Sequence, residues 1–234
     1  MPQIEAAERL YQQLKDWQRP LTALETLHTH LPRFDTSSTL LKTAAVNALM
    51  ATQIFALVAM ASHVENVLGN VQLEKAGPEL VDKIADFKHK NKERECVSFA
   101  SKFAHFFIGP DRFPMKDSYS TKMVEFHLGT QNCVQTEKQV LDESYAAFVR
   151  NIEQLKKRDG LDGVSHRRLD RYLWFAGKYR FFLEKPPFEK RRRAVQIQSA
   201  NGQQNAPEDI TKREFLGSLD ALEYTHDLAA VLGD

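Results

Sequence analysis

The chain has 234 residues, of which 42% are hydrophobic, and its formal net charge is +1. That length supports one domain with a hydrophobic core, or one domain with an appendage. A nearly neutral chain excludes binding to nucleic acid through bulk charge, so any nucleic-acid footprint must come from local basic patches. Cys96 and Cys133 are the only cysteines, which gives no disulfide framework and favours a reducing, cytoplasmic location.

The first half of the chain predicts a series of helices separated by proline, glycine and capping signals. Apolar residues recur at helical spacing in each segment, and Pro20 suits the first position of the second helix. The predicted ranges are 4–17, 20–30, 39–68 and 79–89. The third range is the longest, is rich in alanine and leucine, and is apolar on more than one face. Such a helix is typical of the buried spine of a helix bundle.

One uncharged segment has to be compared with a membrane-spanning helix. Residues 44–61 form a run of eighteen positions without a charged side chain. The run is short for a bilayer span, and it contains Asn47, Thr52 and Gln53. We therefore predict a buried core helix there and no membrane partner.

The second half of the chain continues the helical pattern. The predicted helices cover 97–108, a segment beginning at 117, 138–157, 165–182 and 210–232, and the charged residues 88–95 are predicted as a loop. No convincing strand pattern is present, so the expected fold class is all-α. The expected organisation is a helical domain at 1–185, a basic and then polar linker at 186–209, and a C-terminal amphipathic helix at 210–234.

Lys102 is the first candidate for chemistry. It lies in a helical segment rich in phenylalanine, with Phe99 before it and Phe103, Phe106 and Phe107 after it. A lysine among aromatic rings loses hydration, which disfavours the ammonium form and leaves some neutral amine as a nucleophile. The alternative is a lysine whose aliphatic stem covers core rings while its amine reaches water.

Asp117 is the second candidate. It stands where the next helix would begin, followed by Ser118 and Tyr119. An aspartate at that position accepts amide hydrogen bonds and faces the positive end of the helix, so it stays ionised. Capping alone would explain the residue, but the two roles are compatible. An amine nucleophile near a fixed carboxylate suits attack at a sugar carbon, where positive charge develops in the transition state.

This layout resembles the catalytic segment of helix-hairpin-helix DNA glycosylases. The motifs Ser98-Phe-Ala-Ser-Lys102 and Pro114-Met-Lys-Asp117-Ser are most similar to the bacterial 8-oxoguanine DNA glycosylase-like (OGG-fold) group. The strong part covers 97–119, and a weaker similarity covers 40–67 and 169–179. The resemblance implies that Lys102 displaces a base and forms a Schiff base with C1′ of the deoxyribose, allowing strand cleavage by β-elimination. It also implies that Asp117 stabilises the sugar cation, that no cofactor is needed, and that the partner is duplex DNA.

One departure from that family concerns the segment before the lysine. The family places a glycine-rich hairpin there, whose exposed amides grip DNA phosphate, whereas residues 91–96 contain no glycine. The hairpin is therefore expected to be degenerate. Two alternatives follow: a catalytically inactive DNA-binding module on the same scaffold, or a helical protein-interaction domain. Enzyme activity as a DNA N-glycosylase and AP lyase is thus a hypothesis, and the oligomeric state is open.

Recognition of an extrahelical base requires aromatic surfaces and a few amides. The candidates are Phe103, Phe106, Tyr119, Trp174 and Asn47. The alternative for the aromatic residues is core packing. For Asn47 the alternative is a hydrogen bond between helices, because a buried amide needs partners.

His105 could carry a proton near neutral pH, or pack in the core. For the DNA backbone the candidates are basic residues before the central helix and in the linker. They are Lys88, Lys90, Lys92, Arg94, Arg191 and Arg192. Affinity that rests on such residues should fall steeply with salt, and a solvated charged loop is the alternative for both clusters.

Overall fold

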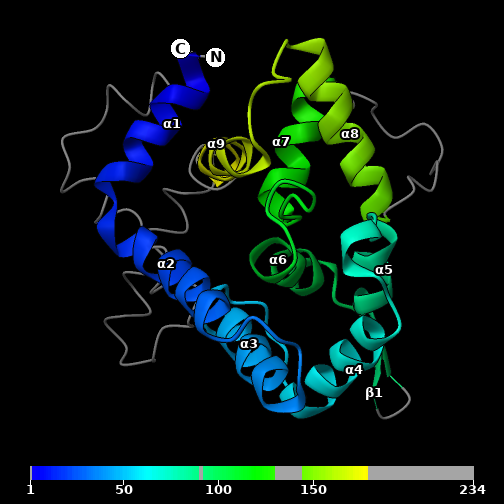
Figure 1. Cartoon of the computed structure of the whole chain (residues 1–234). Coiled ribbons are helices and arrows are strands. Elements are labelled where there is room, and N and C mark those ends of the chain that lie inside the picture. Colours follow the sequence, from blue (N-terminus) through cyan, green and yellow to red (C-terminus); the bar gives the residue numbers. More distant parts are fainter. Residues whose placement is uncertain (1, 90–91, 130–143, 179–234) are drawn as a thin grey trace, which may run out of the picture.

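The computed structural model describes residues 2–89, 92–129 and 144–178, and for 92–95 it describes the backbone (Figure 1). The predicted linker at 186–209, the predicted helix at 210–232 and the boundary at residue 185 lie outside these residues. The ends of the predicted helices at 138–157 and 165–182 also lie partly outside them. Everything stated below about the structure refers to the described part of the chain.

The described residues are mostly helical, which confirms the all-α prediction. The helices are α1 (Pro2–Gln13), α2 (Lys15–His30), α3 (Thr36–Leu49), α4 (Leu57–Gly69), α5 (Glu79–Ala85), α6 (Val97–Phe107), α7 (Ser118–Leu128), α8 (Tyr145–Arg158) and α9 (His166–Lys178), with a short 3-10 turn at Leu73–Lys75. Two strands, β1 (Asp86–His89) and β2 (Lys92–Glu95), form an antiparallel hairpin. None of these helices is long and apolar enough to cross a membrane.

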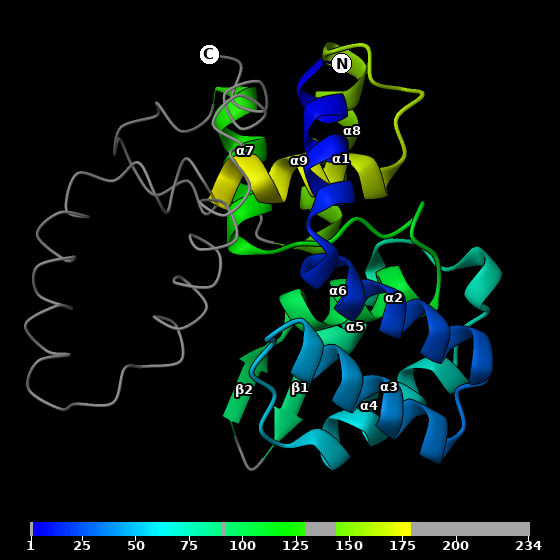
Figure 2. The ribbon, with the colours of Figure 1, turned by 90° about the vertical axis from the view of Figure 1, so that its left-hand side faces the viewer.

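Helix α6 lies at the centre of the molecule. In Figure 2, α1, α7, α8 and α9 lie on one side of it, and α2 to α5 with the hairpin lie on the other. Every residue of α6 except Ser98 is buried. The ring pairs Phe99–Phe103 and Phe103–Phe107 run along the helix at centroid distances of 5.8 and 5.1 Å. A helix that is apolar on all sides is stable only inside such a core.

Helix α7 begins as the sequence predicts. Asp117 is its N-cap, and its carboxylate accepts the backbone N–H groups of Tyr119 and Ser120 at 3.0 and 2.9 Å. The Ser120 hydroxyl accepts the N–H of Asp117 in return at 2.9 Å. This reciprocal capping satisfies amides that the first turn of a helix leaves unpaired.

The prediction of one unbroken helix over 39–68 is wrong, because the chain leaves the helix between α3 and α4. Ala51 and Gln53 adopt left-handed backbone angles, with φ of 49° and 58°. The Asn47 side chain holds this loop: its oxygen accepts from Ile54 N at 2.6 Å and Thr52 Oγ1 at 3.0 Å, and its amide donates to Ile54 O at 3.1 Å. A side chain that replaces lost helical hydrogen bonds can break a helix without glycine or proline.

Two other predictions need correction. Pro20 lies inside α2 and does not begin it. A proline there removes one hydrogen bond to the Asp16 carbonyl, and Asp16 is exposed, so water can supply the missing donor. Within the predicted loop at 88–95, residues 88–89 belong to β1 and residues 92–95 to β2. In β1 the buried apolar residue is Phe87, which is 7% exposed. Its ring centroid lies 5.6 Å from that of His63. A highly charged strand with one anchor gives almost no alternation signal.

Replacing Asn47 with alanine should destabilise the fold by roughly 1–3 kcal/mol, because it leaves backbone and hydroxyl groups of the 50–56 loop without partners. Thr52→Val removes only one of these bonds and should cost less, about 0.5–1.5 kcal/mol. Denaturant unfolding of the three proteins measures both effects. Equal stabilities of Asn47→Ala and the wild type would contradict this role of the side chain.

Candidate functional site

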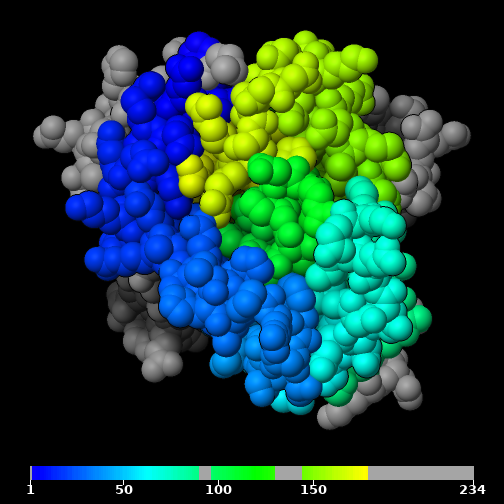
Figure 3. Space-filling model, in the orientation of Figure 1, coloured from blue at the N-terminus to red at the C-terminus, as the bar shows by residue number. Residues whose placement is uncertain are grey.

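A cavity of about 900 Å³ lies between α6, the start of α7, α9 and the α1–α2 corner. These segments meet on the face shown in Figure 3. The lining residues that matter for chemistry are Trp17, Lys102, Asp117, Asp170, Trp174 and Lys178. A volume of this size is within the range of pockets that bind small molecules or a single nucleoside.

Lys102 projects from α6 into this cavity, and the residue is 8% exposed. Burial lowers the pKa of its amine, and the nearby carboxylate of Asp117 opposes that shift. The amine donates a long hydrogen bond, 3.5 Å, to the carbonyl oxygen of Met50 in the loop between α3 and α4. A desolvated amine with a weak partner is available as a nucleophile.

Asp117 lines the same cavity from the N-terminus of α7. Both amides that it caps donate to one carboxylate oxygen, Oδ1, so the cap does not require the other oxygen. The positive end of the helix dipole and the two amide N–H groups face this carboxylate. The carboxylate can therefore face a developing positive charge in the cavity while it continues to cap the helix.

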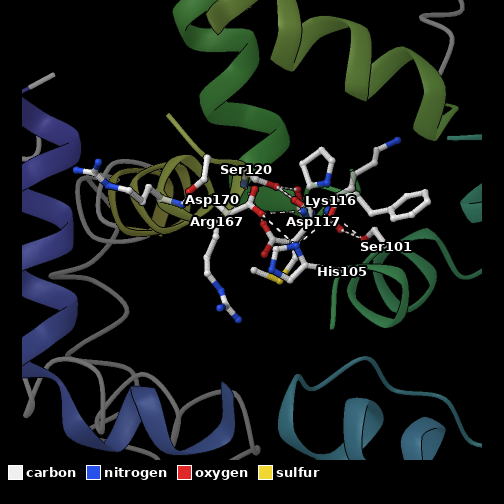
Figure 4. A network of polar contacts seen from close by, with 12 residues as sticks. Ser101, His105, Lys116, Asp117, Ser120, Arg167 and Asp170 are labelled. Atoms are coloured by element: carbon white, nitrogen blue, oxygen red, sulfur yellow. Dashed lines mark hydrogen bonds and ion pairs between the residues drawn. The ribbon is translucent and has the colours of Figure 1, made fainter. Parts of the chain in front are cut away.

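Short polar contacts fix the two candidates relative to each other (Figure 4). Ser101, next to Lys102, accepts the N–H of Lys116 at 3.0 Å, and its hydroxyl lies 3.3 Å from the Lys116 carbonyl. Lys116 directly precedes Asp117. These bonds join the residue before Lys102 to the residue before Asp117, which holds the start of α7 against α6.

Asp170 on α9 holds the same turn from the other side. Its Oδ2 accepts the N–H of Met115 at 3.1 Å, and the residue is 3% exposed. Burial raises the pKa of Asp170 well above its usual value, and the charge of Asp117 adds to the rise. Two aspartate side chains thus line the cavity in different surroundings: Asp117 at a helix N-terminus and Asp170 buried in its wall.

His105 lies behind this wall and does not line the cavity. Its Nδ1 lies 2.9 Å from the carbonyl oxygen of Phe113 and 3.8 Å from Asp170 Oδ2. Burial lowers the pKa of His105 to about 4, so the imidazole is neutral at pH 7. These contacts indicate that His105 holds the segment between α6 and α7 in place.

One face of α9 supplies the opposite wall of the cavity. Asp170, Trp174 and Lys178 follow one another at intervals of four residues, and all three line the cavity. The Trp174 ring lies 4.7 Å from the Trp17 ring of α2, with an interplanar angle of 57°. The Lys178 amine lies 4.7 Å from the Trp17 centroid and 4.6 Å from the Trp174 centroid. Burial lowers the pKa of Lys178 to about 8.

Of the residues predicted for the site, Lys102, Asp117 and Trp174 come together in the cavity. Phe103 and Phe106 are 0% and 6% exposed and lie in the core, and Tyr119 is half-buried near α9. None of these three lines the cavity. Asn47 is engaged in the 50–56 loop, as described above.

The predicted DNA-backbone residues are only partly described. Lys88 lies on β1, its side chain is 60% exposed, and its amine is 3.9 Å from Asp86. Lys92 and Arg94 belong to β2, paired with His89 and Phe87 respectively. Lys90, Arg191 and Arg192 lie outside the described residues.

Sequence reasoning missed three cavity residues: Trp17, Asp170 and Lys178. For α9 a signal existed, because Asp170 and Lys178 share a helical face with Trp174. For Trp17 there was none, since its position depends on how α2 packs against α9. Within the described part of the chain, no group of three or more histidine, cysteine, aspartate or glutamate side chains is arranged to hold a metal ion.

Comparison with known proteins adds little. A family model described only as an N-terminal domain matches residues 3–112, a range that includes Lys102 but ends before Asp117 and α9. No curated protein and no solved structure matches the chain.

Gly177 permits the close approach of α9 to the start of α7. A Cβ atom there would lie 2.7 Å from the Tyr119 carbonyl oxygen and 2.8 Å from Met123 Cγ. Gly177→Ala should therefore destabilise the fold by about 1–3 kcal/mol despite the better helix propensity of alanine. Gly69→Ala is the matched control, because a Cβ atom at the end of α4 meets nothing within 4 Å. A melting temperature of Gly177→Ala equal to or higher than that of Gly69→Ala would contradict this packing.

Lys102→Met should make the protein more stable at pH 7, because it removes a buried ammonium. The folded-state pKa of Lys102 lies below 10.5, so the unfolded chain binds the proton more strongly. At pH values between the folded-state pKa and 10.5, the free energy of unfolding of the wild type therefore rises with pH. The advantage of Lys102→Met should thus shrink between pH 7 and pH 10 in denaturant unfolding. A difference that does not change with pH would contradict the lowered pKa.

Proposed function

We propose that this protein is a DNA glycosylase-like enzyme that excises a base from duplex DNA, with an associated AP-lyase activity. One observation carries the proposal: the Lys102 amine and the Asp117 carboxylate, from consecutive helices, line the same cavity of about 900 Å³. The resemblance of residues 97–119 to helix-hairpin-helix glycosylases supports it independently of the geometry.

The chemistry assigns one role to each group. The neutral fraction of the Lys102 amine attacks C1′ of the deoxyribose, and the bond from C1′ to the base breaks with its electron pair going to the base. The carboxylate of Asp117 stabilises the positive charge that develops on the sugar in this transition state. Ring opening then gives a Schiff base between Lys102 and C1′. Each role uses the charge state that the surroundings favour.

The substrate nucleotide must leave the duplex to reach this amine, because C1′ is inaccessible to a buried side chain in stacked DNA. The cavity volume accommodates one nucleoside. Trp17 and Trp174 line it with apolar, aromatic surface, which suits a base that has lost its stacking neighbours. The identity of that base is not part of the proposal.

DNA phosphates would be bound by the hairpin, which packs against α4 and α5. Only Cys96 separates β2 from α6, so a contact at the hairpin places the duplex close to the helix that carries Lys102. Lys88, Lys92 and Arg94 are the proposed contacts on the hairpin, and neutralising phosphate with such residues makes binding sensitive to salt. This mode would replace the glycine-rich grip, since residues 91–96 contain no glycine.

That same lack of glycine favours a second candidate, a catalytically inactive DNA-binding module on this scaffold. The two candidates differ in one respect only. Both bind duplex DNA in a salt-dependent way, but the inactive module forms no covalent adduct and leaves both strands intact.

Borohydride trapping on duplex DNA containing an abasic site tests the proposal without knowledge of the excised base. The wild type should form a covalent adduct, and Lys102→Gln should abolish it. Asp117→Asn should slow adduct formation by roughly 100-fold, because it removes the charge that faces the iminium cation formed between Lys102 and C1′. Gel electrophoresis of the trapped complex measures all three proteins.

Asp117→Asn also controls for folding, because asparagine caps a helix nearly as well as aspartate. Its thermal stability should stay close to that of the wild type while its adduct formation declines. The Lys102→Gln protein should still bind the DNA. Binding by the wild type without any adduct would sink the glycosylase proposal and support the inactive module.

A further inference from the structure

A strand-cleaving mechanism of the proposed kind needs a second proton acceptor. Once the Lys102 nitrogen is joined to C1′ as an iminium, it has no lone pair with which to remove a proton from C2′. Strand cleavage then depends on another basic group within reach of the same sugar. The cavity contains a second amine, that of Lys178, the last residue of α9.

The buried side chain of Lys178 forms part of the cavity wall. The residue is 6% exposed, and its amine lies 4.7 and 4.6 Å from the ring centroids of Trp17 and Trp174. Both rings line the cavity, so they hold the amine there through cation–π contact. Two rings from different helices fix its position more tightly than a single contact would.

The protonation state of Lys178 fits an acceptor. Desolvation lowers the pKa of this amine to about 8, although the charge of Asp117 opposes the shift. Roughly a tenth of the molecules therefore carry a neutral amine at pH 7, which is a useful fraction for a general base.

The other titratable groups of the cavity suit the step less well. Asp16 is 82% exposed and pairs with Arg19 at 3.0 Å, and burial raises the pKa of the Tyr11 hydroxyl. Asp117 faces the sugar cation as a carboxylate, and burial raises the pKa of Asp170 so that it favours the protonated form. The guanidinium of Arg171 lies over the Tyr11 ring and pairs with Glu8. An arginine remains charged at any physiological pH and cannot accept a proton.

We propose, on the basis of the glycosylase function proposed above, that Lys178 is the proton acceptor for β-elimination at the abasic sugar. Its nitrogen lone pair takes the proton from C2′ of the iminium formed with Lys102. The electrons of the C2′–H bond form the C2′–C3′ double bond, and the C3′–O bond breaks with its pair going to the departing phosphate. Water then hydrolyses the iminium, which releases Lys102 and leaves an unsaturated aldehyde on the 3′ end.

The test separates covalent capture from strand cleavage. Duplex DNA with one abasic site is mixed with excess full-length protein, and two quantities are followed: borohydride-trapped adduct, and nicked strand without borohydride. Lys178→Arg and Lys178→Met should trap within twofold of the wild type but nick at least tenfold more slowly. Arginine keeps the positive charge against the two tryptophan rings and cannot act as the base.

A buried lysine remote from the cavity provides the matched control. Lys156 on α8 is 9% exposed and does not line the cavity, so Lys156→Arg should trap and nick like the wild type. Thermal unfolding checks that each variant is folded.

Two results would overturn the role of Lys178 alone: normal nicking by Lys178→Arg, or trapping that falls in step with nicking, which would make Lys178 a positioning residue. Absence of any adduct with the wild type would instead remove the glycosylase proposal, and this inference with it.

Discussion

The proposed chemistry depends on a lysine amine that the helical core keeps largely out of water. Lys102 belongs to α6, the helix whose other side chains, except Ser98, are buried. An ammonium in such a place costs stability, because desolvation disfavours the charged form. The fold offsets that cost by burying phenylalanine rings around the same helix. The amine is thereby kept partly neutral, and this is the property that the proposed chemistry uses.

The proposed chemistry also requires that side chains far apart in the sequence keep fixed positions around that amine. The contact between Ser101 and Lys116 joins the neighbours of Lys102 and Asp117, and Asp170 holds the intervening turn through the Met115 amide. These bonds are partly buried, so they restrict motion more than contacts in water would. The Lys102 amine makes one long hydrogen bond, to the Met50 carbonyl oxygen, while Asp117 uses one carboxylate oxygen, Oδ1, to cap α7.

The sequence predicted those parts of the structure that rest on local signals. The fold class, the central helix and the start of α7 follow from apolar periodicity and from a capping aspartate followed by serines. The break at 50–56 was missed because its cause is the Asn47 side chain, which no local propensity reveals. The hairpin was missed because its charged strands lack alternation. Trp17 could not be found, since its place against Trp174 depends on the packing of helices distant in sequence.

One feature of the topology bears on how the molecule is made. Helix α1 packs against α9, although they stand at opposite ends of the described chain (Figure 2). Long-range contacts of this kind form late, because a long loop must close before they contribute. During synthesis on the ribosome, α1 therefore emerges well before the surface that covers it, and Lys102 emerges before the wall that shields it. The cavity is completed last, and no partial chain ending before α9 can contain it.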